Sequence, residues 1–320
     1  MPLTTINSGV IRAHKLEFNA ASHCNYSCAE CSHLSPYMRK KLPDLAQFRE
    51  DARTLASVYR ADRLHIVGGE PLLNPQLTDL IAYARESGIA RRVLVATNGA
   101  LLHKMSDELF RSIDELSVSW YPDPRCDDAK IEAARRSCRR WNTKLHVEKI
   151  NTFRKMQPVG IIEDDEIVGK IFAGCQMAHT WGCQTFNDGY FYLCSRPVFT
   201  PLFLSARDGS TTENEQTDGC AIHAPRLPER LRDYLSRRDP LQACRYCLGT
   251  SGKIVPWRQL TAAERKSGAV SNEPLAESLD TSRLHSQLRL RRWQETLHRI
   301  FPATITARVL ARISRQMIGE

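Results

Sequence analysis

Three cysteines stand close together near the start of the chain, in the run Cys24-Asn25-Tyr26-Ser27-Cys28-Ala29-Glu30-Cys31. Their spacing lets one short loop place three thiolates around one corner of an iron–sulfur cube, which leaves the fourth iron without a protein ligand. A cluster that only carries electrons usually has four cysteine ligands, so an open iron indicates a site that binds a substrate or cofactor. The alternative is a closed, tetrahedral zinc site with a distant fourth ligand.

Two further motifs follow short apolar segments. Leu64–Val67 leads into Gly68-Gly69-Glu70-Pro71, and Val93–Ala96 leads into Thr97-Asn98-Gly99. Glycines at a strand end allow a backbone to approach a ligand closely, because no side chain stands in the way. With the cysteine triplet, these motifs resemble the radical S-adenosylmethionine (SAM) superfamily, whose signature is Cys-x3-Cys-x2-Cys.

The resemblance implies a [4Fe–4S] cluster on Cys24, Cys28 and Cys31. In that family, SAM binds the open iron through its amino and carboxylate groups, and one electron converts it to a 5′-deoxyadenosyl radical. The residues implied to contact SAM are Gly68, Gly69, Glu70, Thr97, Asn98 and Ser119, with Ser117 a weaker candidate. The sequence departs from the family at Glu30, where an aromatic or apolar residue usually packs near the adenine.

The elements that must position these residues alternate along the chain from Leu16 to about Ile150. The predicted strands are Leu16–Phe18, Leu64–Val67, Arg92–Ala96, Leu116–Trp120 and Leu145–Ile150. The predicted helices are Asp44–Tyr59, Gln76–Ser87, Ser106–Ile113 and Asp127–Arg140. This alternation predicts an α/β fold with a parallel sheet. The resemblance specifies a partial (β/α)6 TIM-like barrel, open at its side, with cofactors at the carboxyl ends of the strands.

A second set of cysteines lies downstream. Cys175 is followed by Gly189 and Cys194, and Cys244-Arg245-Tyr246-Cys247 adds a pair of thiolates. Asn187-Asp188-Gly189 between aromatic segments predicts a β-hairpin. The pattern resembles the Twitch domain, a shortened SPASM extension, which implies a second, auxiliary [4Fe–4S] cluster on Cys175, Cys194, Cys244 and Cys247. Four thiolates suit structural zinc equally well, so this alternative stays open.

Four cysteines belong to neither set: Cys126, Cys138, Cys183 and Cys220. We expect inert, buried thiols at these positions. Cys183 is also a candidate hydrogen donor, because it lies next to the hairpin and a thiol returns a hydrogen atom to the substrate in radical epimerases.

We divide the chain into a barrel over residues 1–165, an auxiliary domain over 166–257, and a linker with a basic helical tail over 258–320. Residues 205–228 and 260–282 have the composition of loops. Thr281–Glu320 contains eight arginines and two acids, which supply +6 of the net charge of +9. Apolar residues recur there at helical spacing and predict two amphipathic helices, containing Leu284, Leu288, Trp293 and Leu297, then Ile305, Val309, Ile313 and Met317.

The composition narrows the class of protein. No run of eighteen apolar residues is present, and the start of the sequence lacks a secretory leader. We therefore expect a cytoplasmic protein without a membrane span, in which the eleven cysteines serve metal ligation and not disulfides. We do not expect a nucleic acid partner, since the basic tail lies outside the catalytic motifs.

Twitch-type architecture resembles enzymes that act on aminocyclitols and sugars. We expect a small hydroxylated substrate (sugar, aminocyclitol or nucleoside), an oxidoreductase- or lyase-type outcome (oxidation, epimerisation, dehydration or decarboxylation), and an electron donor of the flavodoxin or ferredoxin type. The polar candidates to contact that substrate are Glu17, Asn19, His23, His146 and Glu148. One alternative is a peptide-modifying maturase, although only fifteen residues precede the first predicted strand. Another is a non-catalytic iron–sulfur or RNA-binding module.

Overall fold

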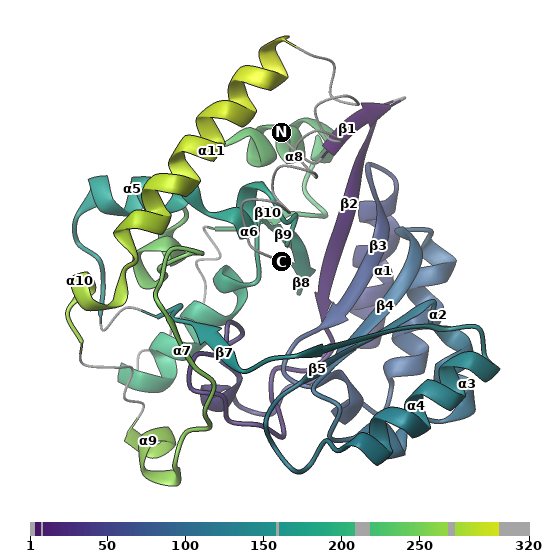
Figure 1. Ribbon diagram of the computed structural model, residues 1–320. Helices are drawn as coiled ribbons and strands as arrows, with labels where there is room; N and C mark the ends of the chain where they lie inside the picture. Colours follow the sequence, from purple (N-terminus) through teal and green to yellow (C-terminus); the bar gives the residue numbers. More distant parts are fainter. Residues whose placement is uncertain (1–3, 8, 158–159, 209–217, 268–272, 301–320) are drawn as a thin grey trace.

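The computed structural model describes residues 4–7, 9–157, 160–208, 218–267 and 273–300 (Figure 1). Its centre is a nine-stranded sheet in the order β10-β9-β8-β2-β3-β4-β5-β6, with β1 paired to β2. Strands β8 and β2 to β6 run parallel to one another, whereas β1, β9 and β10 pair antiparallel at their positions. The predicted α/β fold with a parallel sheet is confirmed. The strands are β1 (Thr4–Asn7), β2 (Val10–Asn19), β3 (Tyr59–Val67), β4 (Ala90–Thr97), β5 (Glu115–Trp120), β6 (Lys144–Lys149), β8 (Thr185–Asn187), β9 (Tyr190–Tyr192) and β10 (Cys220–Ala221).

Four helices cover one face of this sheet, as Figure 1 shows. They are α1 (Leu45–Ala56), α2 (Leu77–Ser87), α3 (Asp107–Ser112) and α4 (Asp128–Arg140). Alternate strand residues such as Leu16, Phe18 and Leu64 form the main core with them. The side chains of Asp44, Ser106 and Asp127 accept hydrogen bonds from backbone amides in the first turns of α1, α3 and α4. All four predicted helices begin within one residue of the observed positions, and these N-caps explain the start of α1, α3 and α4.

The observed sheet differs from the predicted one in two ways: its first long strand begins earlier, and the predicted hairpin is part of it. The first long strand begins at Val10 and not at Leu16, and β1 pairs with its beginning. The predicted hairpin is confirmed as β8 and β9, with positive φ at Asp188 (46°) and Gly189 (82°), as a tight hairpin turn requires. Its first strand also pairs in parallel with β2, at Glu17–Thr185 and Phe18–Phe186. The sheet therefore continues past the domain boundary that we predicted at residue 166.

The remaining elements lie mostly beside the other face of the sheet, except the helix Leu227–Ser236, whose Leu227 and Leu231 belong to the main core. They are β7 (Thr152–Arg154) paired with β11 (Ile254–Pro256), α5 (Asp165–Gly174), α6 (Gln176–His179), α7 (Arg196–Asp208), α8 (Leu227–Ser236), α9 (Ala262–Ser267), α10 (Leu275–Ser278) and α11 (Thr281–Ile300). Short 3-10 helices span Ser35–Tyr37, Pro71–Leu73, Leu102–Lys104 and Gln242–Tyr246. The expected loop over 205–228 was partly wrong, since α7 extends to Asp208 and β10 and the start of α8 follow.

The first helix of the predicted tail is present as α11. Leu284 of α11 packs with Val168 and Ile171 of α5 in a small separate core. Trp293, expected on the apolar face, is 66% exposed. The linker prediction was wrong in part, because α9 and α10 form there and residues 258–260 pack on the cysteine loop, as described below. The predicted helix from Ile305 to Met317 lies outside the described residues. Among the described helices, none is long and apolar enough to cross a membrane.

Candidate active site

Most of the residues that the sequence assigned to the cluster and SAM line one cavity of about 440 Å³ at the carboxyl ends of β2 to β5. These residues are Cys24, Cys28, Cys31, Gly68, Gly69, Thr97, Asn98 and Ser119. Because the parallel strands end at the same edge of the sheet, motifs that are far apart in the sequence meet there.

The two glycines allow the backbone after β3 to pack against the backbone after β2. Gly69 N–H donates to Ala21 O at 2.7 Å, and Glu70 N–H donates to His23 O at 3.0 Å. A Cβ at Gly69 would lie 1.9 Å from His23 O, so a larger residue would force the two segments apart. The glycines thus set the point at which the cysteine loop leaves β2. Their contact with the amino end of SAM stays a prediction.

Glu70 connects the ends of β3 and β4. Its side chain is fully buried, and the carboxylate accepts hydrogen bonds from Thr97 Oγ1 (2.8 Å), Asn98 N (2.9 Å) and Leu72 N (3.0 Å). Burial raises the pKa of Glu70 to about 7, opposed by these hydrogen bonds. Asn98 Nδ2 in turn donates to Asn25 Oδ1 at 2.7 Å. The Glu70 carboxylate therefore holds the residues that form the cavity wall, and its contact with SAM stays a prediction.

An aromatic group that no sequence pattern predicted surrounds the cysteine loop. Trp257 Nε1 donates to Cys28 Sγ at 3.2 Å, and the indole stacks on Tyr121 with ring centroids 5.3 Å apart. Tyr26 is buried under the Arg125 guanidinium, which lies 4.0 Å from its ring centroid. Phe153 completes the group. Glu30, at the position where the family usually has an aromatic or apolar residue, accepts a hydrogen bond from Met156 N with its carboxylate.

The chain beyond Trp257 is paired with the cysteine loop through its backbone. Ala29 N–H donates to Arg258 O at 3.1 Å, and Leu260 N–H donates to Ser27 O at 2.7 Å. The side chain of Gln259 accepts from Ser27 N at 3.1 Å. The segment we expected to be a linker therefore holds the loop that carries Cys28.

The three thiols have the chemistry of cluster ligands. Burial raises the pKa of Cys24 to about 12 and that of Cys28 to about 12, so metal binding must displace their protons. Among the described residues, no three His, Cys, Asp or Glu side chains are close enough to hold a single metal ion. Three soft thiolate donors on the wall of a cavity, with space in front of them, fit an iron–sulfur cluster.

Cys183 and Glu17 line the same cavity. Lys15 Nζ lies 2.8 Å from Glu17 Oε1 and 3.2 Å from Cys183 Sγ, so the three side chains form a connected polar group. The pairing of β8 with β2 places Cys183 next to this strand. Burial raises the pKa of Cys183 to about 12, which keeps its S–H intact at neutral pH. Lys15 was missed from the sequence, although its i, i+2 spacing to Glu17 puts both on one face of β2.

The other polar candidates lie elsewhere. Asn19 lines a different cavity. His146 on β6 lies 2.9 Å from the Glu115 carboxylate, and Glu148 is exposed. His23 contributes its backbone carbonyl to the packing of the glycine motif. Of the five candidates, only Glu17 lines the cavity that contains the three thiols.

The second set of cysteines also gathers. Cys175, Cys194, Cys244 and Cys247 line one small cavity between α5, α6, the start of α7 and the 3-10 helix at Gln242–Tyr246. Burial and then the neighbouring thiols raise the pKa of Cys194 well above its usual value. The Gly249 amide donates to Cys247 Sγ at 3.3 Å. By ligand type, four thiols around one cavity suit an auxiliary cluster and also zinc, although as placed here they are not close enough together to hold a single metal ion. Cys126, Cys138 and Cys220 are buried in the main core, as expected for inert thiols.

Comparison with known proteins gives a family match over residues 18–162, to the radical SAM superfamily. An S-adenosylmethionine-dependent nucleotide dehydratase from Selenomonas ruminantium is 28% identical over 110 residues, which cover 33% of this chain and 39% of that protein. A PqqA peptide cyclase from Streptomyces rochei is 29% identical over 122 residues, which cover 35% of this chain and 34% of that protein. The chain thus spans little more than a third of the length of these curated relatives.

Two solved structures are similar over more of the chain, at low identity. Native anSMEcpe with bound AdoMet and Kp18Cys peptide matches 89% of this chain and 98% of its own, with 11% identity and a TM-score of 0.45. BtrN in complex with AdoMet and 2-DOIA matches 70% of this chain and 82% of its own, with 13% identity and a TM-score of 0.42.

Proposed function

Because residues 18–162 belong to the radical SAM superfamily, we propose that this chain cleaves SAM reductively and takes a hydrogen atom from a small hydroxylated substrate. The substrate class is a sugar, an aminocyclitol or a nucleoside. When bound, the cluster and SAM supply a primary carbon radical at the cavity. The observation that carries the proposal is that the three thiols of the cysteine loop share this cavity with a buried acid and a buried thiol.

The polar group of Lys15, Glu17 and Cys183 supports a hydroxylated substrate. The buried carboxylate of Glu17 is stabilised by its ion pair with Lys15 and can accept a hydrogen bond from a substrate hydroxyl. In an oxidation, Glu17 accepts the hydroxyl proton as the carbonyl forms; an iron–sulfur cluster held by Cys175, Cys194, Cys244 and Cys247 would take up the remaining electron. A cavity of about 440 Å³ is within the size range of small-molecule sites.

Cys183 supports a different reaction at the same site, epimerisation in place of oxidation. Its protonated thiol can return a hydrogen atom to the substrate radical, as an epimerisation requires. The thiyl radical left on Cys183 is then restored to a thiol by one electron from a flavodoxin- or ferredoxin-type donor and one proton. Replacement of Cys183 by Ala separates the two outcomes. We expect loss of epimerised product with hydrogen abstraction retained, whereas unchanged turnover removes Cys183 from the mechanism. The matched control is Cys138→Ala, a buried thiol in the main core.

The test of the substrate class is deuterium transfer into 5′-deoxyadenosine from C–H-deuterated sugars, aminocyclitols, nucleosides and a peptide. We expect transfer from a hydroxylated small molecule, and loss of that transfer in Glu17→Gln while SAM cleavage without substrate persists. The similarity to a PqqA peptide cyclase makes the peptide the second candidate. Transfer from the peptide alone would replace our assignment with peptide modification.

A further inference from the structure

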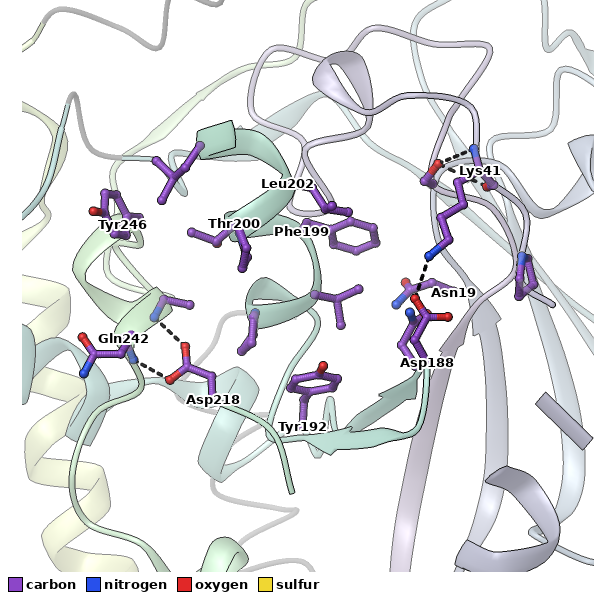
Figure 2. Close-up of a pocket in the computed structure, with 18 of the residues that line it drawn as sticks. Asn19, Lys41, Asp188, Tyr192, Phe199, Thr200, Leu202, Asp218, Gln242 and Tyr246 are labelled. Carbon is purple, nitrogen blue, oxygen red and sulfur yellow. Dashed lines mark hydrogen bonds and ion pairs between the residues drawn. The ribbon is translucent and has the colours of Figure 1, made fainter. Parts of the chain in front are cut away.

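A second cavity, of about 420 Å³, lies between the end of β2, the β8–β9 hairpin, α7 and the 3-10 helix at Gln242–Tyr246 (Figure 2). Phe199, Thr200 and Leu202 of α7 face Asn19 and Tyr192 across it. No described residue lines both this cavity and the one that contains Cys24, Cys28 and Cys31. The two are close neighbours, since the rings of His33 and Phe199 are in contact, with centroids 5.5 Å apart.

Two polar side chains in the wall of this cavity are buried without a partner. Asn19 is 5% exposed and Thr200 is 2% exposed. Neither the amide of Asn19 nor the hydroxyl of Thr200 has a hydrogen-bond partner among the described residues. A buried, unpaired polar group costs about 1–3 kcal/mol, so retaining two of them indicates that something else satisfies them.

The charged groups of the cavity already have partners in the protein. Lys41 Nζ pairs with Asp188 Oδ2 at 2.7 Å, at one side of the cavity. Asp218 accepts hydrogen bonds from the backbone amides of Gln242 (2.6 Å) and Ala243 (2.7 Å), as Figure 2 shows. A charged ligand group would therefore be buried against an amide and a hydroxyl without a counter-charge, which is unfavourable.

The unpaired polar groups and the apolar wall indicate the chemical class of ligand that this cavity would bind. An amide and a hydroxyl each offer a donor and an acceptor, which a ligand hydroxyl matches. The rings of Phe199 and Tyr192 offer apolar faces to the carbon skeleton of a ring. We propose that this cavity binds a neutral, hydroxylated ring molecule, with its hydroxyl groups on Asn19 and Thr200. This site is additional to the SAM cavity, and occupancy requires neither SAM nor turnover.

The experiment measures binding of glucose and myo-inositol to the full, reconstituted chain by calorimetry and saturation-transfer NMR. Glucose 6-phosphate and glucosamine are the charged counterparts. We expect saturable binding of at least one neutral probe, weaker binding of the charged ones, and no displacement by SAM. No binding of either neutral probe at millimolar concentrations, tighter binding of a charged one, or displacement by SAM would overturn the proposal.

Two near-isosteric variants test the residues themselves. Thr200→Val removes one hydrogen bond and should weaken binding roughly 2- to 12-fold, and Asn19→Leu should weaken it further. Both variants should be at least as stable as the parent in thermal unfolding, because each removes an unpaired polar group. Ser35→Ala is the matched control, since Ser35 is also buried and unpartnered among the described residues but lies outside the cavity wall. Unchanged binding in both test variants, or equal weakening in the control, contradicts the assignment.

Discussion

The indole Nε1 of Trp257 donates a hydrogen bond to Cys28 Sγ at 3.2 Å, although 229 positions separate the two residues in the sequence. The contact is held on both sides, by the stacking of the indole on Tyr121 and by the backbone pairing of residues 27–29 with 258–260. A segment from the far end of the chain therefore positions the proposed cluster loop.

The first prediction concerns this hydrogen bond. A donor to a ligand sulfur stabilises the more negative, reduced state, so Trp257→Phe should lower the midpoint potential of the cluster. The expected shift is roughly 20–60 mV, from about 0.5–1.5 kcal/mol for one hydrogen bond and about 59 mV per 1.4 kcal/mol in a one-electron couple. Redox titration followed by electron paramagnetic resonance measures it. Trp293→Phe, an exposed tryptophan, is the control. An equal potential in parent and Trp257→Phe would show that the contact has no electronic role.

The second prediction concerns Glu70. Both of its oxygens accept hydrogen bonds in the buried network with Thr97 and Asn98. In Glu70→Gln the amide NH2 has to face one of these donors, so we expect the free energy of unfolding to fall by roughly 1–3 kcal/mol and SAM affinity to fall with it. Urea denaturation and equilibrium dialysis measure the two effects. Glu148→Gln, at an exposed position of β6, should change neither. Full stability and full affinity in Glu70→Gln would contradict this role.

The third prediction is a loss of stability in acid. Burial lowers the pKa of His65 to about 3, and its Nε2 has no partner among the described residues. Between pH 6.5 and 3 the unfolded chain binds a proton that the folded chain does not, so stability falls as the pH is lowered through this window. At pH 5, this effect of His65 lowers the free energy of unfolding by up to about 2 kcal/mol relative to neutral pH. His65→Gln should lose less stability than the parent between pH 7 and pH 5, measured by urea denaturation. The exposed His103→Gln should follow the parent, and an identical pH profile for His65→Gln would be the contrary result.

The fourth prediction tests the two sets of cysteines separately. Anaerobic reconstitution should load about eight irons per chain, as two cubes require. The triple variant Cys24/Cys28/Cys31→Ala and the double variant Cys244/Cys247→Ala should each retain about four. Zinc at the second set, with about four irons in the parent and none in the triple variant, would replace the auxiliary cluster by a structural zinc site.

The sequence predicted the local features of this molecule well. All five predicted barrel strands and all four helices are present, because each has a clear apolar pattern, and three of the helices also carry a side-chain cap. The hairpin at Asp188 and Gly189 followed from its turn residues. The cavity with the three thiols of the cysteine loop is also lined by most of the residues assigned from the motifs, since the carboxyl ends of parallel strands meet at one edge of the sheet.

Long-range pairing was not predictable. No periodicity indicates that β8 joins β2, that Trp257 reaches Cys28, or that Lys15 bridges Glu17 and Cys183. Each depends on how distant segments pack, which a local pattern does not encode. The support that Glu70 gives to the cavity wall was not predictable for the same reason, because only its burial and three hydrogen bonds reveal it.

The most direct test of the account is reductive SAM cleavage by the anaerobically reconstituted chain. With dithionite or reduced flavodoxin, we predict stoichiometric 5′-deoxyadenosine and methionine from the parent and from Cys138→Ala, and none from Cys28→Ala. Absence of 5′-deoxyadenosine from parent protein with full iron and sulfide content, or equal amounts from Cys28→Ala, would contradict it.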